Sequence, residues 1–294
     1  RVGAVAEGEI KSSWAAVQDH TRHFSDFTFV YPVISRRSQG LSIGINLNPD
    51  KVCNFDCIYC EVDRSTPGTR TEVDLKQMRE ELLAMVQFVK GGRLAREPKF
   101  DEVGDLAREV KDIAFSGDGE PTMINNFSEC VESVAEVKRH EGLSETKMVL
   151  ITDAAGLDKT DVKHGLSILD SHNGEIWAKL DAGSERYYKT VNRSSVKFER
   201  VLCNLLETAR ERPIIIQSLF LRAHGKAMSE QELKAFCGRL NDITSGGGRI
   251  QEVHLYTIAR PTPEDFAAKL ENEELEAFAQ KIRKETDIEV AVFP

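Results

Sequence analysis

The chain contains the apolar stretch Leu41-Ser-Ile-Gly-Ile-Asn-Leu-Asn48, and soon after it the segment Cys53-Asn-Phe-Asp-Cys57-Ile-Tyr-Cys60. The first stretch predicts a buried β-strand, and the second carries three thiols in the spacing CxxxCxxC. A strand followed directly by a polar loop is typical of parallel α/β folds, where ligands collect at the carboxyl ends of the strands. These residues therefore predict both the start of the fold and the position of its site.

Three clustered cysteines are one ligand short of a closed metal site. A four-iron four-sulfur cluster normally binds four cysteine thiolates, so three leave one iron open to a small ligand. A structural zinc site needs four ligands and usually shows paired CxxC motifs, and a tight trio of cysteines has no internal disulfide pairing. The spacing favours an iron-sulfur cluster on Cys53, Cys57 and Cys60, with zinc or unliganded thiols as the alternatives.

The other three cysteines are spread through the later part of the chain. Cys130, Cys203 and Cys237 each fall in a helical apolar pattern. A free cysteine in such a pattern usually behaves as a small core residue. None of the three is expected to be a fourth ligand.

Strand and helix patterns alternate beyond the first strand. Strands are expected at 41–48, 112–116, 147–152, 175–181, 213–222, 251–260 and 289–293. Amphipathic helices are expected at 71–90, 126–139, 159–170, 195–210, 229–243 and 272–285. Such alternation predicts βαβ units and a parallel sheet. Six strands before the short C-terminal strand are too few for a closed eight-stranded barrel, so we expect an α/β fold of the partial, open (β/α)6 TIM-barrel type.

Length and composition allow one large core. With 294 residues, 40% of them hydrophobic, we expect one barrel domain over 41–294 and an N-terminal extension or cap over 1–40. Within the extension, a short helix is expected at 10–18 and a β-like run at 27–31. No apolar run is long enough to span a bilayer and no signal-peptide pattern opens the chain, which predicts a cytoplasmic protein with no membrane partner.

Polar residues follow the second and third predicted strands. Ser116-Gly-Asp-Gly-Glu-Pro-Thr122 contains two glycines, Gly117 and Gly119, that allow close backbone approach, and the turn Gly119-Glu120-Pro121 carries a carboxylate. Asp153 ends the third strand. It is expected either to reach the site or to cap the following loop.

Three further strands place polar side chains on one face. A two-residue period groups Trp177 with Lys179 and Asp181, which predicts a polar cavity; the alternative is a Lys179–Asp181 ion pair that only fills the barrel. Later strands contribute the following residues, which we expect to line the pocket: Gln217, Arg222, Tyr256 and Arg260.

The CxxxCxxC motif, with Tyr59 before its last cysteine, resembles the signature of the radical S-adenosylmethionine enzymes. The segment around Glu120 resembles the GGEP motif of that family, with Asp118 in place of the first glycine. Several further segments are most similar to the subgroup related to the wyosine-base synthases: Gly44-Ile-Asn46, Pro49 to Cys57, Lys179-Leu-Asp181 and Tyr256 to Arg260. The resemblance extends over residues 35–294 and is most specific at the cysteine loop.

The resemblance implies a partial barrel and a definite chemistry. The three cysteines would hold one 4Fe-4S cluster, and S-adenosylmethionine would be cleaved reductively to a 5′-deoxyadenosyl radical that abstracts a hydrogen atom from substrate. It also implies that Tyr59 lies near the adenine and that the Glu120 turn holds the amino group of the cofactor. Cofactor binding is further expected of Gly117, Gly119, Pro121, Asp153, Asp181, Gln217 and Tyr256, and catalysis of Lys179, Asp181 and Arg260. An external reductant such as flavodoxin or ferredoxin is implied, because the chain holds no second cysteine cluster.

The resemblance leaves the substrate open. Wyosine-base synthases modify a guanine in transfer RNA, so modification of an RNA base is one candidate activity. Their second cluster comes from N-terminal cysteines, whereas residues 1–52 contain no cysteine here, and a net charge of −9 does not favour binding to nucleic acid. The alternatives are an activase that installs a glycyl radical on a partner protein and, from another class, a metal-stabilised binding protein without catalysis.

Overall fold

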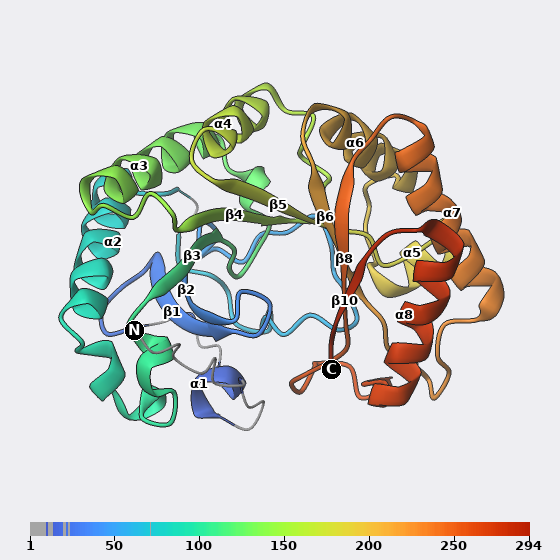
Figure 1. The fold of residues 1–294 in the computed structure, drawn as a ribbon, viewed down its shortest axis with the longest axis horizontal. Coiled ribbons are helices and arrows are strands. Elements are labelled where there is room, and N and C mark those ends of the chain that lie inside the picture. Colours follow the sequence, from blue (N-terminus) through green and yellow to red (C-terminus); the bar gives the residue numbers. More distant parts are fainter. Residues whose placement is uncertain (1–9, 11–13, 20–21, 23, 71) are drawn as a thin grey trace, which may run out of the picture.

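The computed structural model describes residues 10, 14–19, 22, 24–70 and 72–294. Its main element is an eight-stranded sheet in the order β1-β2-β3-β4-β5-β6-β8-β10. The strands are β1 (Val30–Ser35), β2 (Gly40–Ile45), β3 (Val110–Phe115), β4 (Lys147–Thr152), β5 (Gly174–Lys179), β6 (Ile214–Leu219), β8 (Ile250–Tyr256) and β10 (Val290–Phe293). The sheet is strongly curled, and its edge strands β1 and β10 are not paired with each other, so it forms an open half-barrel (Figure 1).

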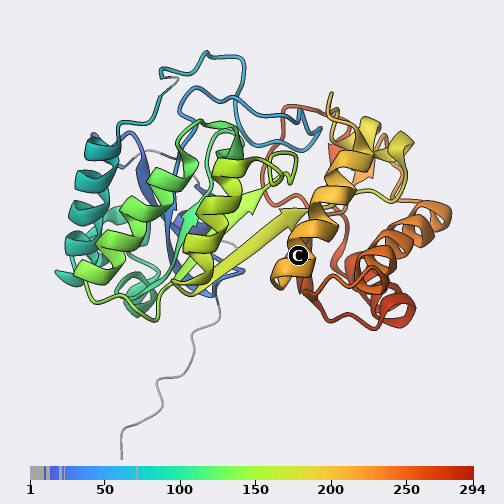
Figure 2. The same ribbon diagram turned by 90° about the horizontal axis from the view of Figure 1, so that it is seen from above.

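Helices cover the outer face of this sheet (Figures 1 and 2). They are α2 (Leu75–Lys90), α3 (Phe127–His140), α4 (Thr160–Asp170), α6 (Phe198–Glu211), α7 (Glu230–Ser245) and α8 (Asn272–Thr286). The short helix α1 (Ala15–Gln18) lies instead on the open side of the half-barrel, next to β1 (Figure 1), and the short helix α5 (Glu185–Val191) precedes α6. Short 3-10 helices lie at Leu94–Arg96, Pro98–Phe100, Gly104–Ala107 and Pro121–Met123. The partial barrel and the order of the major elements predicted from the sequence are confirmed.

Parallel pairing follows from the helical crossovers between strands. From β2 through β10 all neighbouring strands of the sheet are parallel, for example with Ile43 opposite Ile113 and Phe115 opposite Leu150. The outward faces of these strands are buried against the helices, and their inward faces meet inside the half-barrel. All the carboxyl ends of the parallel strands therefore open at the same edge of the sheet.

The first strand is an addition to the expected fold. The β-like run expected at 27–31 becomes β1, which extends to Ser35 and pairs antiparallel with β2. The backbone N–H groups of Phe29 and Val30 donate to one carboxylate oxygen of Glu81 on α2, at 2.7 and 3.2 Å, and Thr28 donates to the other at 2.9 Å. Residues 30–35 therefore belong to the sheet, and α2 holds the start of their strand in place.

We expect Glu81→Gln to lower the free energy of unfolding by about 2 kcal/mol, because an amide nitrogen would face backbone donors that now bind a carboxylate. Urea denaturation measures the change. The neighbouring Glu80→Gln is the matched control, since Glu80 is 66% exposed and its nearest cation is 3.9 Å away. Equal stability of the two variants would contradict this role of Glu81.

Several predicted boundaries are wrong at the ends of strands. The strand expected over 213–222 ends at Leu219, whose N–H donates to the Asp181 side chain. The small sheet of β7 (Arg222–Ala223) and β9 (Ala267–Ala268), and helix α5, were not predicted. Part of the helix expected at 10–18 lies outside the described residues, as does residue 71. No helix in the described part of the chain is long and apolar enough to cross a membrane.

Candidate active site

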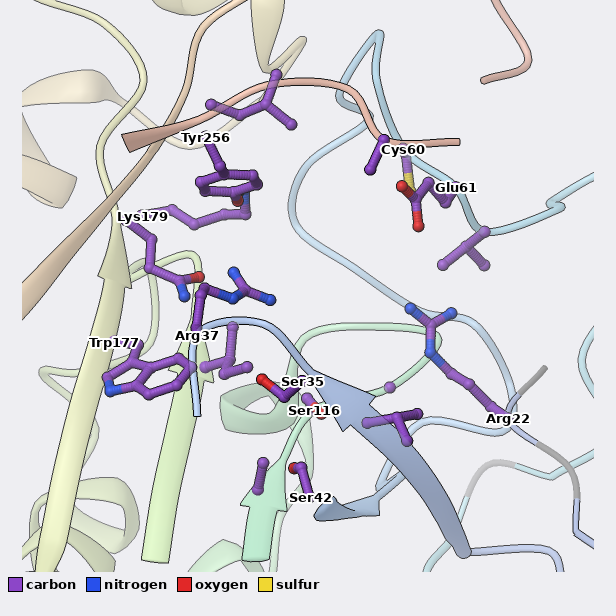
Figure 3. A pocket seen from close by; sticks show the side chains of 18 of the residues that line it. Arg22, Ser35, Arg37, Ser42, Cys60, Glu61, Ser116, Trp177, Lys179 and Tyr256 are labelled. Carbon is purple, nitrogen blue, oxygen red and sulfur yellow. The ribbon is translucent and has the colours of Figure 1, made fainter. Parts of the chain in front are cut away.

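A cavity of about 300 Å³ lies within the half-barrel and reaches the carboxyl ends of the strands. Figure 3 shows Cys60 and Glu61 on one side of it, Lys179, Trp177 and Tyr256 on the other, and Arg37 between them. Most of the residues predicted for the site line this cavity: Cys53, Cys57, Tyr59, Cys60, Gly117, Gly119, Glu120, Asp153, Lys179, Gln217, Tyr256 and Arg260. The fold therefore brings together segments that are 200 residues apart in the sequence.

Each of the three clustered thiols has a nitrogen donor beside its sulfur. The backbone N of Phe55 lies 3.4 Å from Cys53 Sγ, Asn192 Nδ2 lies 3.4 Å from Cys57 Sγ, and Arg64 Nη2 lies 3.8 Å from Cys60 Sγ. Hydrogen bonds to sulfur stabilise thiolate ligands and tune the potential of iron-sulfur clusters. The donor set therefore fits a thiolate-bound cluster.

The arrangement does not match a closed site for a single metal ion. In the part of the chain that the structure describes, no group of three His, Cys, Asp or Glu side chains is placed to hold one metal ion. A cluster binds its cysteines through different irons, so its thiols stand farther apart than the ligands of one zinc ion. Among the described residues these three thiols share a cavity without a fourth protein ligand, which leaves a coordination position open, as an open-coordinated cluster requires.

Without a metal, the Cys53 and Cys57 thiols are held in their protonated form. Burial raises the pKa of Cys53 to about 12, with Asp153 adding to the effect. Burial likewise raises the pKa of Cys57 to about 11. A metal ion in the cavity would reverse this preference, because coordination deprotonates a thiol.

The Glu120 carboxylate organises the loop opposite the cysteines. One of its oxygens accepts from Thr122 N at 3.1 Å and from the hydroxyls of Thr122 and Thr152 at 2.6 Å each, and the other accepts from Asp153 N at 2.7 Å. Burial raises the pKa of Glu120, and these four donors oppose that rise. Glu120 thus joins the ends of β3 and β4 and still reaches the cavity.

Close contacts explain why a glycine stands at position 119 and an aspartate at position 118, directly before Glu120. A Cβ on Gly119 would lie 2.0 Å from the carbonyl oxygen of Val52, so no side chain fits between this turn and the cysteine loop. Asp118, which departs from the family motif, accepts from Arg22 at 2.8 Å and from the Asn46 amide at 2.7 Å. Asp118, in place of the first glycine of the motif, therefore makes two additional contacts, and the backbone at Gly119 still packs closely against Val52.

Asp153 satisfies both interpretations made from the sequence. It lines the cavity, with Oδ2 3.9 Å from Cys53 Sγ, and its Oδ1 accepts from Ala155 N at 2.8 Å, which caps the following loop. Burial raises its pKa, and the nearby Glu120 carboxylate raises it further.

Lys179 lies at the centre of a buried polar network. Its ammonium donates to the hydroxyls of Tyr59 and Tyr256, at 2.9 Å each, and Tyr59 donates to Asp181. Burial lowers the pKa of Lys179, but Asp181 and Tyr256 outweigh that effect and raise it overall. Lys179 is therefore a cation that joins the cysteine loop to strands β5 and β8, and not the simple ion-pair partner of Asp181.

Three residues named from the sequence do not line the cavity. Asp181 lies behind Tyr59, where its carboxylate accepts from Tyr59, from Asn192 at 2.7 Å and from the N–H of Leu219 at 2.8 Å. Pro121 is buried as the first residue of a 3-10 helix. Arg222 pairs with Glu274 on the outer side of the barrel, because β6 ends three residues earlier. The place in the pocket predicted for Arg222 is therefore wrong. The cofactor-binding roles expected of Pro121 and Asp181 stay predictions, and Asp181 contacts the cavity wall through Tyr59.

Four contributors were missed. Arg22, Arg37 and Arg64 come from loops, and Asn192 ends the unpredicted helix α5. Loops and short helices carry no periodic pattern, so the sequence offers no signal for these side chains. Arg260, in contrast, lies in the cavity as expected and pairs with Glu61 of the cysteine loop.

Comparisons with known proteins place this geometry in context. No protein-family model matches the chain. A UPF0026 protein of Helicobacter pylori strain 26695 is 26% identical over 249 residues, which are 83% of this chain and 70% of that protein. A UPF0026 protein of Methanocaldococcus jannaschii is 28% identical over 163 residues, 55% of this chain and 43% of that protein. The structure of TYW1 with a lysine-pyruvate adduct bound superimposes with a TM-score of 0.53 at 17% identity, over 85% of this chain and 74% of that one.

The fold is that of TYW1, a wyosine-base synthase. The resemblance to the wyosine-base-synthase subgroup that the sequence indicated is thus confirmed at the level of the fold.

A further similarity is to a protein named GTPase Obg, from Brachyspira hyodysenteriae. It is 23% identical over 265 residues, which are 89% of this chain and 34% of that protein. The chain thus spans about a third of that relative, and less than half of the Methanocaldococcus jannaschii protein. The sequence contains no GxxxxGK[ST] phosphate-binding loop, so its residues give no support to GTP binding of that kind.

Proposed function

We propose that this protein is a radical S-adenosylmethionine enzyme that binds one 4Fe-4S cluster through Cys53, Cys57 and Cys60. The observation that carries the proposal is the convergence of these three thiols with the Gly119-Glu120 turn on one cavity, on a fold shared with TYW1. When bound, the cluster would supply the electron that cleaves S-adenosylmethionine to methionine and a 5′-deoxyadenosyl radical, which abstracts hydrogen from the substrate.

The residues of this chain would bind and orient the reactants. Oε2 of Glu120 accepts a single hydrogen bond, from Asp153 N, so it can accept another from the amino group of the cofactor. Close contact between Gly119 and Val52 keeps that carboxylate next to the cysteine loop. Lys179 holds the Tyr59 ring through its hydroxyl, and the ammonium lies 4.7 Å from the ring centroid. The Tyr59 side chain therefore forms part of the cavity wall beside the thiols. Asp181 is a positioning residue, because it accepts a hydrogen bond from the Tyr59 hydroxyl.

Enclosure of the cavity would protect the reaction from water. Tyr59 and Gln217 are both buried, and the walls include Trp177 and Leu219. A reactive radical requires such exclusion, because water and stray side chains would otherwise compete with the substrate. An external one-electron donor such as flavodoxin or ferredoxin is part of the proposal.

Spectroscopy tests the proposal directly. After anaerobic reconstitution with iron and sulfide, and reduction with dithionite, we expect an electron paramagnetic resonance signal that changes when S-adenosylmethionine is added. Chromatography should then detect 5′-deoxyadenosine. A signal that does not respond to the cofactor, together with no 5′-deoxyadenosine, would contradict the proposed enzyme and favour a metal-stabilised binding protein.

A further inference from the structure

Arg64 is the only charged group among the three nitrogen donors that lie beside the clustered thiols. Its Nη2 is 3.8 Å from Cys60 Sγ, and its Nη1 donates to the carbonyl oxygen of Phe55 at 3.2 Å. The backbone N of Phe55 in turn lies 3.4 Å from Cys53 Sγ. One guanidinium therefore contacts the third cysteine directly and the first through Phe55.

The turn that carries Arg64 is held by its own hydrogen bonds. The Asp63 carboxylate accepts from the N–H of Ser65 at 2.9 Å and from the hydroxyl of Thr66 at 3.0 Å. The Lys51 ammonium donates to the carbonyl oxygen of Thr66 at 3.0 Å, which ties the turn to the start of the cysteine loop. These contacts keep Arg64 at the cavity, which its side chain lines.

The charge of Arg64 is not neutralised within the part of the chain that the structure describes. The two acidic residues next to it in the sequence are engaged elsewhere, Glu61 with Arg260 and Asp63 with its own turn. The Nε atom of Arg64 is buried and has no hydrogen-bond partner among the described residues. A buried N–H without a partner costs stability, so this atom points to an acceptor in the cavity that the polypeptide does not supply.

We propose that Arg64 raises the reduction potential of the cluster that Cys53, Cys57 and Cys60 would bind. Reduction transfers one electron from the external donor and adds one negative charge to a group that is already negative through its three thiolates. A guanidinium beside one of these sulfurs stabilises the added charge, and its charge-assisted hydrogen bonds are about twice as strong as neutral ones. The inference rests on the proposed function for the cluster and deepens it by assigning the residue that tunes its potential.

The carboxylate of Asp153 acts in the opposite direction at the other end of the thiol set, where its Oδ2 lies 3.9 Å from Cys53 Sγ. No ion pair joins Asp153 to Arg64 among the described residues. Replacing Arg64 therefore leaves the contribution of Asp153 in place. The difference in potential between a variant and the parent measures the contribution of Arg64 alone.

The test compares the midpoint potential of the cluster in the parent and in Arg64→Gln. Both full-length chains are reconstituted anaerobically with iron and sulfide, without S-adenosylmethionine, and titrated with titanium(III) citrate while electron paramagnetic resonance reports the reduced fraction. At the potential that half-reduces the parent cluster, we expect the ratio of reduced to oxidised cluster in Arg64→Gln to be at least about 10-fold lower. For a one-electron couple this corresponds to a midpoint potential about 59 mV lower.

Two further variants assign the shift to the charge of Arg64. Arg64→Lys keeps a positive charge but not the guanidinium fork, so its midpoint potential should lie between those of the parent and Arg64→Gln. Arg70→Gln is the matched control. Arg70 is an exposed arginine of the same loop that donates to Gln77 at 2.8 Å, and it is not among the residues that line the cavity. Its replacement should leave the midpoint potential unchanged.

A purely structural role of Arg64 predicts a different result. If the guanidinium only braced the loop through Phe55, Arg64→Gln would lower Tm and the iron content, and the remaining cluster would keep the midpoint potential of the parent. That result, or an equal shift in Arg70→Gln, would overturn the inference. Should Arg64→Gln bind too little iron for a titration, Arg64→Lys decides: an unchanged midpoint potential would overturn the inference and a lowered one would support it.

The outcomes also separate this inference from the proposed function. A cluster whose midpoint potential depends on Arg64, in a protein that never forms 5′-deoxyadenosine, would support the inference and contradict the proposed enzyme. Formation of 5′-deoxyadenosine with a midpoint potential independent of Arg64 would do the reverse. A parent chain that binds no iron-sulfur cluster would contradict both.

Discussion

Cys57→Ser is expected to abolish cluster binding and the formation of 5′-deoxyadenosine. The Cys57 sulfur lies in the cavity beside the Asn192 amide, and a serine hydroxyl is a poor substitute for a soft thiolate. We expect the yield of 5′-deoxyadenosine to fall by more than about 100-fold. Losing even a hydrogen-bond partner of a metal ligand costs about 10- to 100-fold in metal affinity or activity. Iron and sulfide content, the absorbance of the cluster and the yield of 5′-deoxyadenosine measure the effect.

The matched control is Cys203→Ser. Cys203 is an exposed cysteine on α6, outside the cavity, so this variant should bind iron and cleave S-adenosylmethionine as the parent does. If Cys57→Ser retained a full cluster, a ligand set other than the three clustered thiols would be required. A similar loss in both variants would point to general damage and would remove the support for the assigned ligands.

Glu120→Gln is the second substitution with a large expected effect, this time on both stability and cofactor binding. The carboxylate accepts four hydrogen bonds, two from Thr122, one from Thr152 at the end of β4 and one from Asp153, whereas a glutamine would turn an N–H₂ group towards at least one of those donors. We expect a loss of about 2–4 kcal/mol in the free energy of unfolding. Affinity for S-adenosylmethionine should fall at least about 10-fold, because the charge that would bind its amino group is removed.

Urea denaturation and equilibrium dialysis of the reconstituted protein measure these two effects. Glu102→Gln provides the control, because Glu102 is exposed in a loop and should leave both quantities unchanged. If Glu120→Gln lost stability but kept its cofactor affinity, Glu120 would be a purely structural residue. Unchanged stability would contradict the hydrogen-bond network itself.

The order of the fold could be derived from the sequence because strand and helix periods are local properties. The apolar run at 41–48 and the alternating patterns after residue 110 correspond to β2 and to the following strands and helices. The cysteine spacing and the turn at Gly119-Glu120 were likewise visible, since each is confined to a few consecutive residues. Their meeting in one cavity follows from the rule that parallel strands share a carboxyl edge.

Other parts of the site depend on contacts that no local pattern encodes. The two-residue period placed Asp181 with Lys179, but β5 ends at Lys179, so the next two residues leave the strand and Asp181 turns behind Tyr59. Arg222 was expected in the pocket for the same reason, and it lies outside because β6 ends at Leu219 and Arg222 belongs to β7. Both errors arise beyond the last residue of a strand, where the two-residue period no longer sets the direction of a side chain.

The amino-acid sequence alone determined the parallel half-barrel, the three thiols and the carboxylate turn, because hydrophobic period and residue spacing are local quantities. Only the tertiary structure decided which side chains complete the cavity. Arg37 enters from the turn of a hairpin and Arg64 from a loop, and Asn192, at the end of a short helix, donates to Cys57 Sγ behind the cavity wall. Their roles depend on distances across the barrel, which arise when the curled sheet brings remote segments together.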